Sequence, residues 1–240
     1  MSSWAPVQRI VAAPPAVLLS CEHASNELPP GYAWPEEDAW ITSTHWAWDP
    51  GAADMTRAIA ARLRAPAVLS RFSRLVIDPN RPLDSDTLVR GVAEGREIAL
   101  NRGVTAEEVA ARVALCWRPY HAELDVMVAA HPGVDLLSMH SFTPVYEGAV
   151  RRTEVGVLFD DDEAWAEAWF DGLQASGLRV ARNDPWSGRG GFMYSAQEVA
   201  RRYGRRAIEL EIRQDLACDP EVSGRLVRLI AEVAERVGRG

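Results

Sequence analysis

Short apolar runs alternate with amphipathic helical patterns along nearly the whole chain, and this alternation restricts the fold more than any other feature. The apolar runs have the length of buried strands and lie at 16–21, 66–69, 73–77, 135–140, 154–159 and 206–212. The helical patterns place apolar residues three or four positions apart and lie at 51–63, 105–120, 160–173, 195–203 and 220–237. This order predicts an α/β fold of three layers, α/β/α, in which helices cover both faces of a central mixed, mostly parallel sheet.

Three local signals refine this prediction. The neighbouring runs at 66–69 and 73–77 are expected to form an antiparallel hairpin at the edge of the sheet. Thr105-x-x-Glu108 is a capping-box pattern and predicts the start of a helix. Pro119 is expected to kink or divide that helix, because proline cannot donate the backbone hydrogen bond that the helix interior requires.

The composition is that of an ordinary globular protein, and no feature divides the chain. Of its 240 residues, 48% are hydrophobic and 25% are charged. Without a repeat, a low-complexity tract or a Gly/Ser linker, residues 1–240 are predicted to form a single domain. The net charge of −8 argues against nucleic acid or an anionic membrane as a partner. No apolar run approaches the roughly 20 residues that span a bilayer, and the sequence carries no signal for an oligomeric state.

The cysteines indicate a reducing compartment. Cys21, Cys116 and Cys218 lie far apart and form neither a disulfide framework nor a metal knuckle. Residues 18–21 resemble a lipoprotein cleavage site, but the preceding segment is rich in proline and lacks a long apolar run. We therefore expect a cytoplasmic protein. Thiol catalysis by Cys21 with His23 is a weaker hypothesis, because residues two apart on a strand need not present their side chains to one substrate atom.

Polar residues with catalytic potential follow or end several of the predicted strands. They are Glu22, His23, Asp78, Asn80, Arg81, His140, Glu209 and Glu211. Because the carboxyl ends of parallel strands meet at one edge of a sheet, these side chains are expected to converge there. Two histidines and one carboxylate are a common ligand set for catalytic zinc, with a fourth position left for water. Another carboxylate can act as general base, and arginines can hold an anionic substrate.

Taken singly, each of these residues also has a structural interpretation. A histidine at the end of a strand is more often a hydrogen-bonded structural residue than a ligand. Glu209 and Glu211 point to the same side of their strand and could lie on a half-exposed face. Residues 78–82 have the composition of a turn. Only their joint occurrence, in this order, favours a functional site.

Five segments make a more specific resemblance. They are CEHASNELP at 21–29, HWAWDPGA at 45–52, RFSRLVIDPNRP at 71–82, SMHSF at 138–142 and ELEIRQDL at 209–216. In this order and spacing they resemble the N-formylglutamate amidohydrolase family, over about residues 17–220. The most specific pieces are His-x-x-x-(Asp/Glu)-x-Pro at 23–29 and Arg-x-x-Arg-x-x-Ile-Asp-x-Asn-Arg at 71–81. The family is similar in turn to zinc carboxypeptidases and aspartoacylase-like deacylases, which implies a zinc-carboxypeptidase-like fold.

The resemblance implies a metal site that holds one Zn²⁺ ion. Carried over to this sequence, His23 and His140 become zinc ligands. Glu27 matches the acidic position of the family's first motif and becomes the third ligand, and Glu22 is the alternative. Asp49 has two interpretations of equal weight: it orients a ligand histidine, or it caps the helix that begins near Pro50.

The resemblance also implies roles for the arginines and the late glutamates. Asn80 and Arg81 become the clamp for a substrate carboxylate. Arg74 or Arg71 becomes the residue that polarises the scissile carbonyl. Glu211 becomes the general base, because its Leu-Glu-Ile context matches the family better than that of its alternative, Glu209.

The remaining candidate residues also have structural interpretations, which need no role in a functional site. His45, His121 and His131 are expected to be structural. The segment 183–191 is either a mobile lid over the substrate or simply a long loop, and Arg189 within it need not reach the site. Its glycines lack the strand–turn–helix setting of a dinucleotide-binding loop.

These observations together predict an enzyme with a small-molecule substrate. The predicted reaction is zinc-dependent hydrolysis of the amide bond of an N-acyl acidic amino acid, such as N-formyl-L-glutamate. A first alternative is a zinc amidase or carboxypeptidase that acts on another N-acyl amino acid or on a small peptide. A second alternative, from another class, is a metal-free binding or regulatory protein with the same fold.

Overall fold

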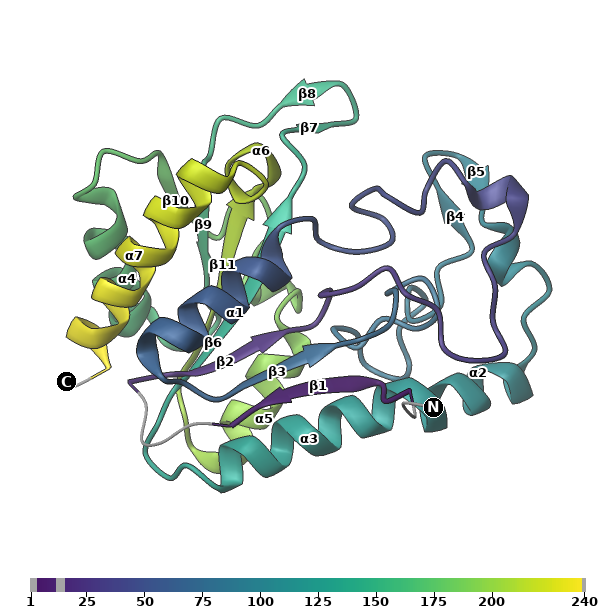
Figure 1. Ribbon diagram of the computed structural model, residues 1–240, viewed down its shortest axis with the longest axis horizontal. Helices are drawn as coiled ribbons and strands as arrows, with labels where there is room; N and C mark the ends of the chain where they lie inside the picture. Colours follow the sequence, from purple (N-terminus) through teal and green to yellow (C-terminus); the bar gives the residue numbers. More distant parts are fainter. Residues whose placement is uncertain (1–3, 12–15, 239–240) are drawn as a thin grey trace.

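A seven-stranded mixed sheet forms the centre of the protein in the computed structural model, which describes residues 4–11 and 16–238 (Figure 1). Its strand order is β1-β3-β2-β6-β11-β9-β10. The four central strands β3, β2, β6 and β11 are parallel, whereas β1 and β9 run antiparallel to their inner neighbours. The strands are β1 Val7–Ile10, β2 Leu18–Cys21, β3 Ala67–Ser70, β6 Leu136–Phe142, β9 Val155–Leu158, β10 Val180–Arg182 and β11 Ala207–Arg213.

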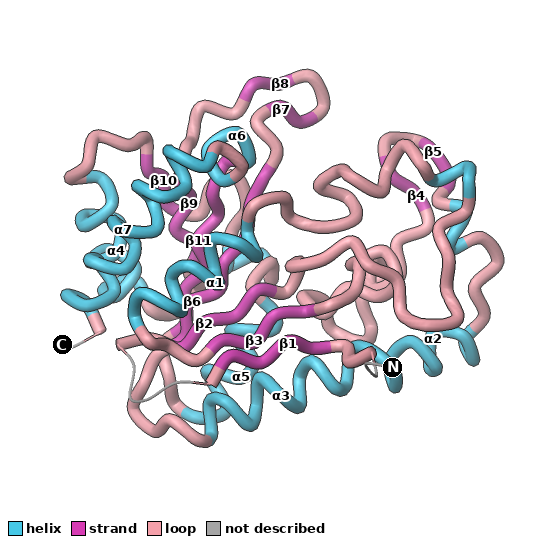
Figure 2. The backbone as a smooth tube through the Cα atoms, viewed as in Figure 1, coloured by secondary structure: helices cyan, strands magenta, loops and turns pink. Residues whose placement is uncertain are grey.

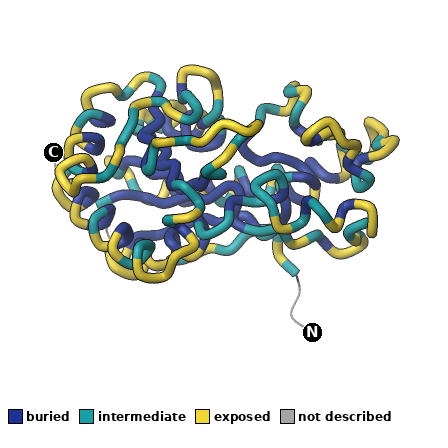
Figure 3. Tube along the Cα trace, turned by 90° about the horizontal axis from the view of Figure 1, so that it is seen from above, coloured by how far each residue is buried: buried dark blue, intermediate teal, exposed yellow. Residues whose placement is uncertain are grey.

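Helices cover both faces of this sheet, as the tube in Figure 2 shows. One layer contains α1 Ala52–Leu63, α4 Glu163–Gln174 and α7 Pro220–Val237, and the other contains α3 Arg118–Ala129 and α5 Tyr194–Tyr203. Between the described helices and the sheet lie two apolar cores, and the central strands are the most deeply buried part of the chain (Figure 3). The predicted three-layer α/β/α architecture is confirmed. Within the described residues, no helix combines the length and apolarity needed to cross a membrane.

Smaller elements extend from the sheet toward its carboxyl edge. Two short hairpins project there (Figure 1): β4 Val92–Ala93 with β5 Arg96–Glu97, and β7 Val145–Tyr146 with β8 Ala149–Val150. A four-residue helix, α6 Gln214–Ala217, follows β11 directly. These additions lie at the end of the sheet where the carboxyl ends of the parallel strands meet.

Strand β11 explains how acidic residues come to lie inside the protein. Ile208, Leu210 and Ile212 point into the core under α1, α4 and α7. Successive side chains on a strand point to opposite faces, so Glu209 and Glu211 point to the other face. Both glutamates are buried, at 2% and 5% exposure. The alternative of a half-exposed strand is therefore wrong, because both faces of β11 are covered.

The predicted edge hairpin at 66–77 is also wrong. Only its first half is a strand, β3, while residues 73–77 form turns. Ser73 accounts for part of this difference, because its hydroxyl donates to the carbonyl of Ala47 and accepts from the Leu75 amide. Leu75 packs among loop residues, and Val76 and Ile77 pack in the core beneath α3, so these side chains are buried without strand pairing. The antiparallel partner of β3 is β1, whose sequence VQRI is too short and polar to give a strong strand signal.

The helix signals at 105–120 are confirmed. The hydroxyl of Thr105 accepts a hydrogen bond from the Glu108 amide and caps α2 Ala106–Arg112. A π-helical turn, Val113–Trp117, then separates α2 from α3, and Pro119 occupies the first turn of α3. The wider π turn lies where proline withholds a backbone donor, so the expected division of the helix occurs immediately before this residue.

Replacement of Leu137 tests the core beneath the site. This β6 side chain is fully buried, so Leu137→Ala should lower the free energy of unfolding by about 2–5 kcal/mol. Leu83→Ala is the matched control, because Leu83 is 47% exposed, and it should change stability by less than ~0.5 kcal/mol. Urea denaturation measures both values. Equal stability of the two variants would contradict the packing described here.

Candidate active site

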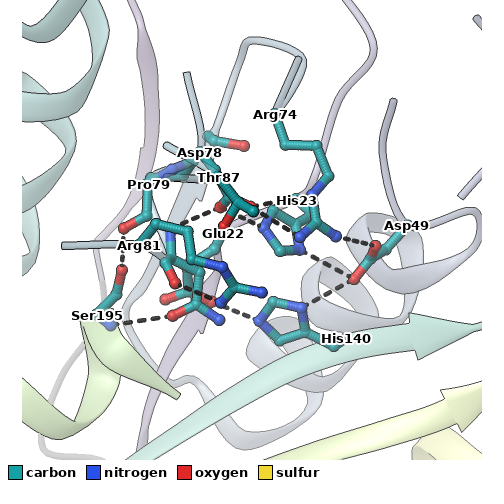
Figure 4. A network of polar contacts seen from close by, with 12 residues as sticks. Glu22, His23, Asp49, Arg74, Asp78, Pro79, Arg81, Thr87, His140 and Ser195 are labelled. Atoms are coloured by element: carbon teal, nitrogen blue, oxygen red, sulfur yellow. Dashed lines mark hydrogen bonds and ion pairs between the residues drawn. The ribbon is translucent and has the colours of Figure 1, made fainter. Parts of the chain in front are cut away.

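Most of the predicted site residues converge at the carboxyl ends of β2, β6 and β11, whereas Glu27 and Arg71 do not. His23 follows β2, His140 lies within β6, and Glu209 and Glu211 lie within β11. They line one cavity of about 290 Å³ together with residues from the loops at 45–49, 74–90, 141–151 and 186–192. Figure 4 shows the polar network on its floor.

Two histidines share one carboxylate at the centre of this network. Asp49 Oδ2 lies 2.8 Å from His140 Nδ1 and 3.4 Å from His23 Nδ1 (Figure 4). The two imidazole rings meet edge to face, with centroids 4.7 Å apart. All three side chains are buried. Asp49 therefore contacts both histidines, and it does not cap α1, whose N-cap is Gly51.

The far nitrogen of each ring is held by another carboxylate. His23 Nε2 lies 2.8 Å from Asp78 Oδ1, and His140 Nε2 lies 2.9 Å from Glu22 Oε2. Because an ionised carboxylate only accepts, each Nε2 carries a proton and donates it. This arrangement fixes the ring orientation and directs both Nδ1 atoms toward Asp49. Carboxylates that hold the outer nitrogen are typical of histidines that bind metals.

The donor set fits a divalent cation. One donor atom from each of His23, Asp49 and His140 lies within 4.8 Å of the others. The Nδ1 atom of His23 is buried and has no hydrogen-bond partner in the described part of the chain. Carboxylates surround His140 and raise its pKa well above the usual range, although burial opposes this. A cation bound between these atoms would displace the ring protons that face Asp49.

The two outer carboxylates are fixed in their charged forms. Glu22 accepts hydrogen bonds from Tyr120 Oη at 2.9 Å and from Ser138 Oγ at 2.6 Å, in addition to His140. Burial alone would raise the pKa of Glu22, but His140 and the hydroxyls of Ser138 and Ser20 lower it to about 2. For Asp78, burial is likewise outweighed by Arg74 and His23, and its pKa lies well below the usual range. Both carboxylates can therefore accept from the histidines.

Glu27 and Arg71 are not brought to this cluster. The Glu27 side chain is 57% exposed, and its carboxylate faces Arg71 at 3.6 Å, outside the cavity. The backbone accounts for this placement, because the Glu27 carbonyl accepts from the Ser73 amide and fixes residue 27 beside the segment 71–73. Glu22 contacts the outer nitrogen of His140. Neither predicted third ligand faces the space between the two Nδ1 atoms, where Asp49 lies.

Two buried glutamates of β11 stand beside His140. Glu211 is the register partner of His140, and its Oε2 is buried without a hydrogen-bond partner among the described residues. Glu209 Oε2 lies 3.4 Å from His140 Nε2. Burial, together with the charges of Glu22 and Asp49, raises the pKa of Glu209 to about 7 against the effect of His140. Burial also raises the pKa of Glu211 well above its usual range. Strongly perturbed carboxyls in one cleft are typical of functional sites.

Asn80 and Arg81 enter the site in different ways. Asn80 Oδ1 accepts from the Ser195 amide at 3.0 Å, and its Nδ2 donates to the Phe192 carbonyl at 2.7 Å. This amide fastens the segment 192–195 to the floor of the cavity. Arg81 lies over the Phe192 ring, 5.0 Å from its centroid, and lines the cavity with its guanidinium. Arg74 is paired with Asp78 at 2.7 Å and also lines the cavity.

Comparison with known proteins places the chain in a family. The sequence model of the N-formylglutamate amidohydrolase family matches residues 15–218. The chain belongs to the N-formylglutamate amidohydrolase family. The resemblance drawn from the sequence motifs is thereby confirmed, and membership supports an enzyme that hydrolyses amide bonds. No curated protein matches this sequence.

Two solved structures are similar over almost the whole length of the chain. A gene product from Agrobacterium tumefaciens has a TM-score of 0.91 and 32% identity, and the match covers 98% of this chain and 95% of that protein. An N-formylglutamate amidohydrolase from Ralstonia eutropha has a TM-score of 0.73 and 20% identity, with 98% of both chains covered. At 20% sequence identity, the similarity to the Ralstonia eutropha protein shows a shared fold alone.

Within this family fold, several other candidates now have defined places. His121 stacks on Trp117 and His131 contacts the Met127 carbonyl, outside the cavity, whereas His45 lines it. Arg189 contacts Glu163 at 3.4 Å rather than the site. Cys21 is fully buried, and burial raises the pKa of its thiol to about 12, which disfavours thiolate chemistry.

The family motifs do not identify two arginines that the fold adds to the cavity. Arg90 lies over the ring of Trp46, and Arg151 follows the β7–β8 hairpin. No pattern in the sequence distinguishes either residue from the other arginines. Their only signal is a position in loops that follow polar, turn-rich segments, which many surface arginines share.

Proposed function

We propose that this protein is a zinc-dependent amidohydrolase that removes the acyl group from an N-acyl acidic amino acid, with N-formyl-L-glutamate as the first substrate to test. The observation that carries this proposal is the buried His23–Asp49–His140 set beside Glu209 and Glu211 in an arginine-lined cavity. Family membership supports the reaction type. The chemistry of the donor set supports the metal, because two imidazoles and a carboxylate are typical of catalytic zinc.

Asp49, rather than Glu27, is proposed as the third zinc ligand. Its Oδ2 atom faces both Nδ1 atoms, whereas the Glu27 carboxylate lies at the surface. Glu22 and Asp78 would orient the two ligand histidines through their outer nitrogens. A divalent ion held there polarises a carbonyl group and makes water more acidic.

Glu211 is proposed as the general base. Glu211 lines the cavity, and its buried Oε2 has no hydrogen-bond partner among the described residues, whereas Glu209 Oε2 lies 3.4 Å from both His140 Nε2 and Asn80 Nδ2. Glu211 would take a proton from the attacking water while the water oxygen bonds to the amide carbon. The same proton then passes to the nitrogen as the carbon–nitrogen bond breaks, which yields a carboxylic acid and an amine.

The arginines of the 71–82 segment have separate roles in this proposal. Arg74, held by Asp78 beside the ligand Asp49, would stabilise negative charge on the carbonyl oxygen. Arg81 would bind the α-carboxylate of the substrate, and bidentate geometry would fix orientation as well as affinity. Asn80 would act on Arg81 indirectly, because it fastens Phe192, the ring beneath that guanidinium.

Metal content and turnover, measured together, test the proposal. The purified protein should contain about one equivalent of zinc and release formate and glutamate from N-formyl-L-glutamate. Chelation should abolish turnover, and added zinc should restore it. A panel of N-acyl amino acids and dipeptides identifies a different substrate. Zinc-free protein without hydrolytic activity would instead support a metal-free binding protein.

Variants of the two competing acidic residues separate the ligand assignments. Asp49→Ala should lose stoichiometric zinc, because it removes the only carboxylate, within the described residues, that faces both Nδ1 atoms. Glu27→Ala should retain zinc, since its side chain is 57% exposed and lies outside the cavity. Elemental analysis of the folded proteins measures both. Zinc loss in Glu27→Ala with retention in Asp49→Ala would return the assignment to Glu27.

A pair of conservative variants tests the general base. Glu211→Gln should keep zinc but lower kcat by a factor of about 10²–10⁴, which is the usual contribution of general acid–base catalysis. Glu209→Gln should have the smaller effect on kcat. Circular dichroism and zinc content show whether each variant is folded and loaded. If Glu209→Gln loses more turnover than Glu211→Gln, the proton transfer belongs to Glu209.

A further inference from the structure

Three arginines on the cavity wall lack the acidic partners that arginines in such positions usually have. Arg81, Arg90 and Arg151 line the same cavity as the histidines. Across residues 4–11 and 16–238, no carboxylate oxygen comes within 4.0 Å of their guanidinium nitrogens. Arg74 differs, because it is paired with Asp78 at 2.7 Å. The wall of the cavity thus carries three guanidinium groups that have no ion-pair partner among the described residues.

Arg151 is held in place by aromatic rings instead of by an acid. Its guanidinium carbon lies 4.6 Å from the centroid of Tyr146, 4.8 Å from that of Trp186 and 5.6 Å from that of Phe142. The guanidinium of Arg151 makes one hydrogen bond within the described chain, to the Thr143 carbonyl, and this bond is long at 3.5 Å. Ring faces fix the plane of a guanidinium but use none of its N–H donors. The donors of Arg151 are therefore positioned and largely free.

Arg151 and Arg81 stand over two different rings of one stacked pair. Phe192, beneath Arg81, stacks on Trp186 with centroids 5.2 Å apart and planes inclined by 19°. Trp186 in turn lies beneath Arg151. The two arginines therefore belong to one wall but to different positions along it. This arrangement fits a ligand with two separated anionic groups better than a ligand with one.

Arg90 is the third guanidinium of this wall and lies over the ring of Trp46, whose centroid is 6.3 Å from that of Tyr146. Burial lowers its pKa, and the positive charges of Arg74 and Arg81 lower it further. Arg151 has a different neighbour: burial lowers its pKa, whereas the negative charge of Glu211 opposes that shift. The geometry that separates Arg81 from Arg151 is therefore their placement over two different rings, Phe192 and Trp186.

We propose that Arg151 forms a second carboxylate subsite, which selects substrates with an acidic side chain. The inference rests on the proposed function, in which Arg81 takes the α-carboxylate and the scissile amide lies at the histidine cluster. Arg151 then receives the side-chain carboxylate of an N-acyl dicarboxylic amino acid. The planar guanidinium, held by Tyr146 and Trp186, offers parallel N–H donors to the two carboxylate oxygens.

A substrate pair that differs only in this group tests the subsite. Arg151→Met removes the guanidinium but keeps an unbranched side chain that can lie between the same rings. For N-formyl-L-glutamate, kcat/KM should fall by about tenfold or more, the worth of a charge-assisted pair in a partly buried site. For N-formyl-L-glutamine, whose side chain ends in a neutral amide, it should change by less than about twofold, because no ionic pair is lost.

Arg152→Met is the matched control. Arg152 is the exposed neighbour of Arg151 and does not line the cavity, so this variant loses the same charge without touching the subsite. It should leave the preference for glutamate over glutamine unchanged. An equal loss on both substrates in Arg151→Met, or a selective loss in Arg152→Met, would overturn the inference.

A binding measurement keeps the inference separate from the catalytic proposal. On the zinc-loaded protein, calorimetry should show that glutarate binds at least about tenfold more tightly than glutaramate, and that Arg151→Met removes this preference. If the protein hydrolyses no N-formyl substrate, the proposed function is refuted. The comparison of glutarate with glutaramate binding then still tests the subsite. A wild-type protein without preference for glutarate would refute the subsite.

Discussion

The rest of the site depends on one constraint, which is that two buried imidazoles must face a single carboxylate. Burying charged groups is costly unless each has partners. Here Asp49 lies between His23 and His140, while Asp78 and Glu22 hold their outer nitrogens. Each outer carboxylate has further donors of its own. The inward nitrogens are thereby fixed in position before any ligand arrives, which is what a metal site or a catalytic cluster requires.

The sheet topology brings these side chains together. Strands β2, β6 and β11 are adjacent and parallel, so the residues at their carboxyl ends share one edge although they are far apart in sequence. The register places Glu211 beside His140, and the two-residue period of the strand turns Glu209 to the same side. The apolar side chains of the same strands anchor the helices on the opposite face. In β6 and β11, Met139, Leu210 and Ile212 pack against helices on one face, whereas His140, Glu209 and Glu211 stand on the other.

The sequence was sufficient to predict the architecture, the family and most of the cluster. Apolar runs predict buried strands, and the two histidines stand at the ends of such runs. It was less informative where the chain is irregular. Asp49 follows a long segment without periodicity, so only the fold decides between a helix cap and a contact with both histidines. Glu27 matched a motif by spacing, yet its backbone bond to the 71–73 segment leaves its side chain at the surface. Arg151 has no motif, because aromatic residues from separate loops define its place.

The net charge of the protein is negative, but the charge on one wall of the cavity is positive. The chain carries a net charge of −8, yet one wall of the candidate active-site cavity presents arginines that have no ion-pair partner among the described residues. Glu22, Asp49 and Asp78 at the floor of that cavity are paired with histidines and with Arg74 rather than with the arginines of the wall. An anionic ligand can therefore bind at the wall although the chain as a whole is acidic, because salt screens charges that lie farther away than about 8–10 Å. In the proposed function, substrate recognition and metal binding thus use different side chains, so a multiply charged substrate could bind beside a cluster of buried acids.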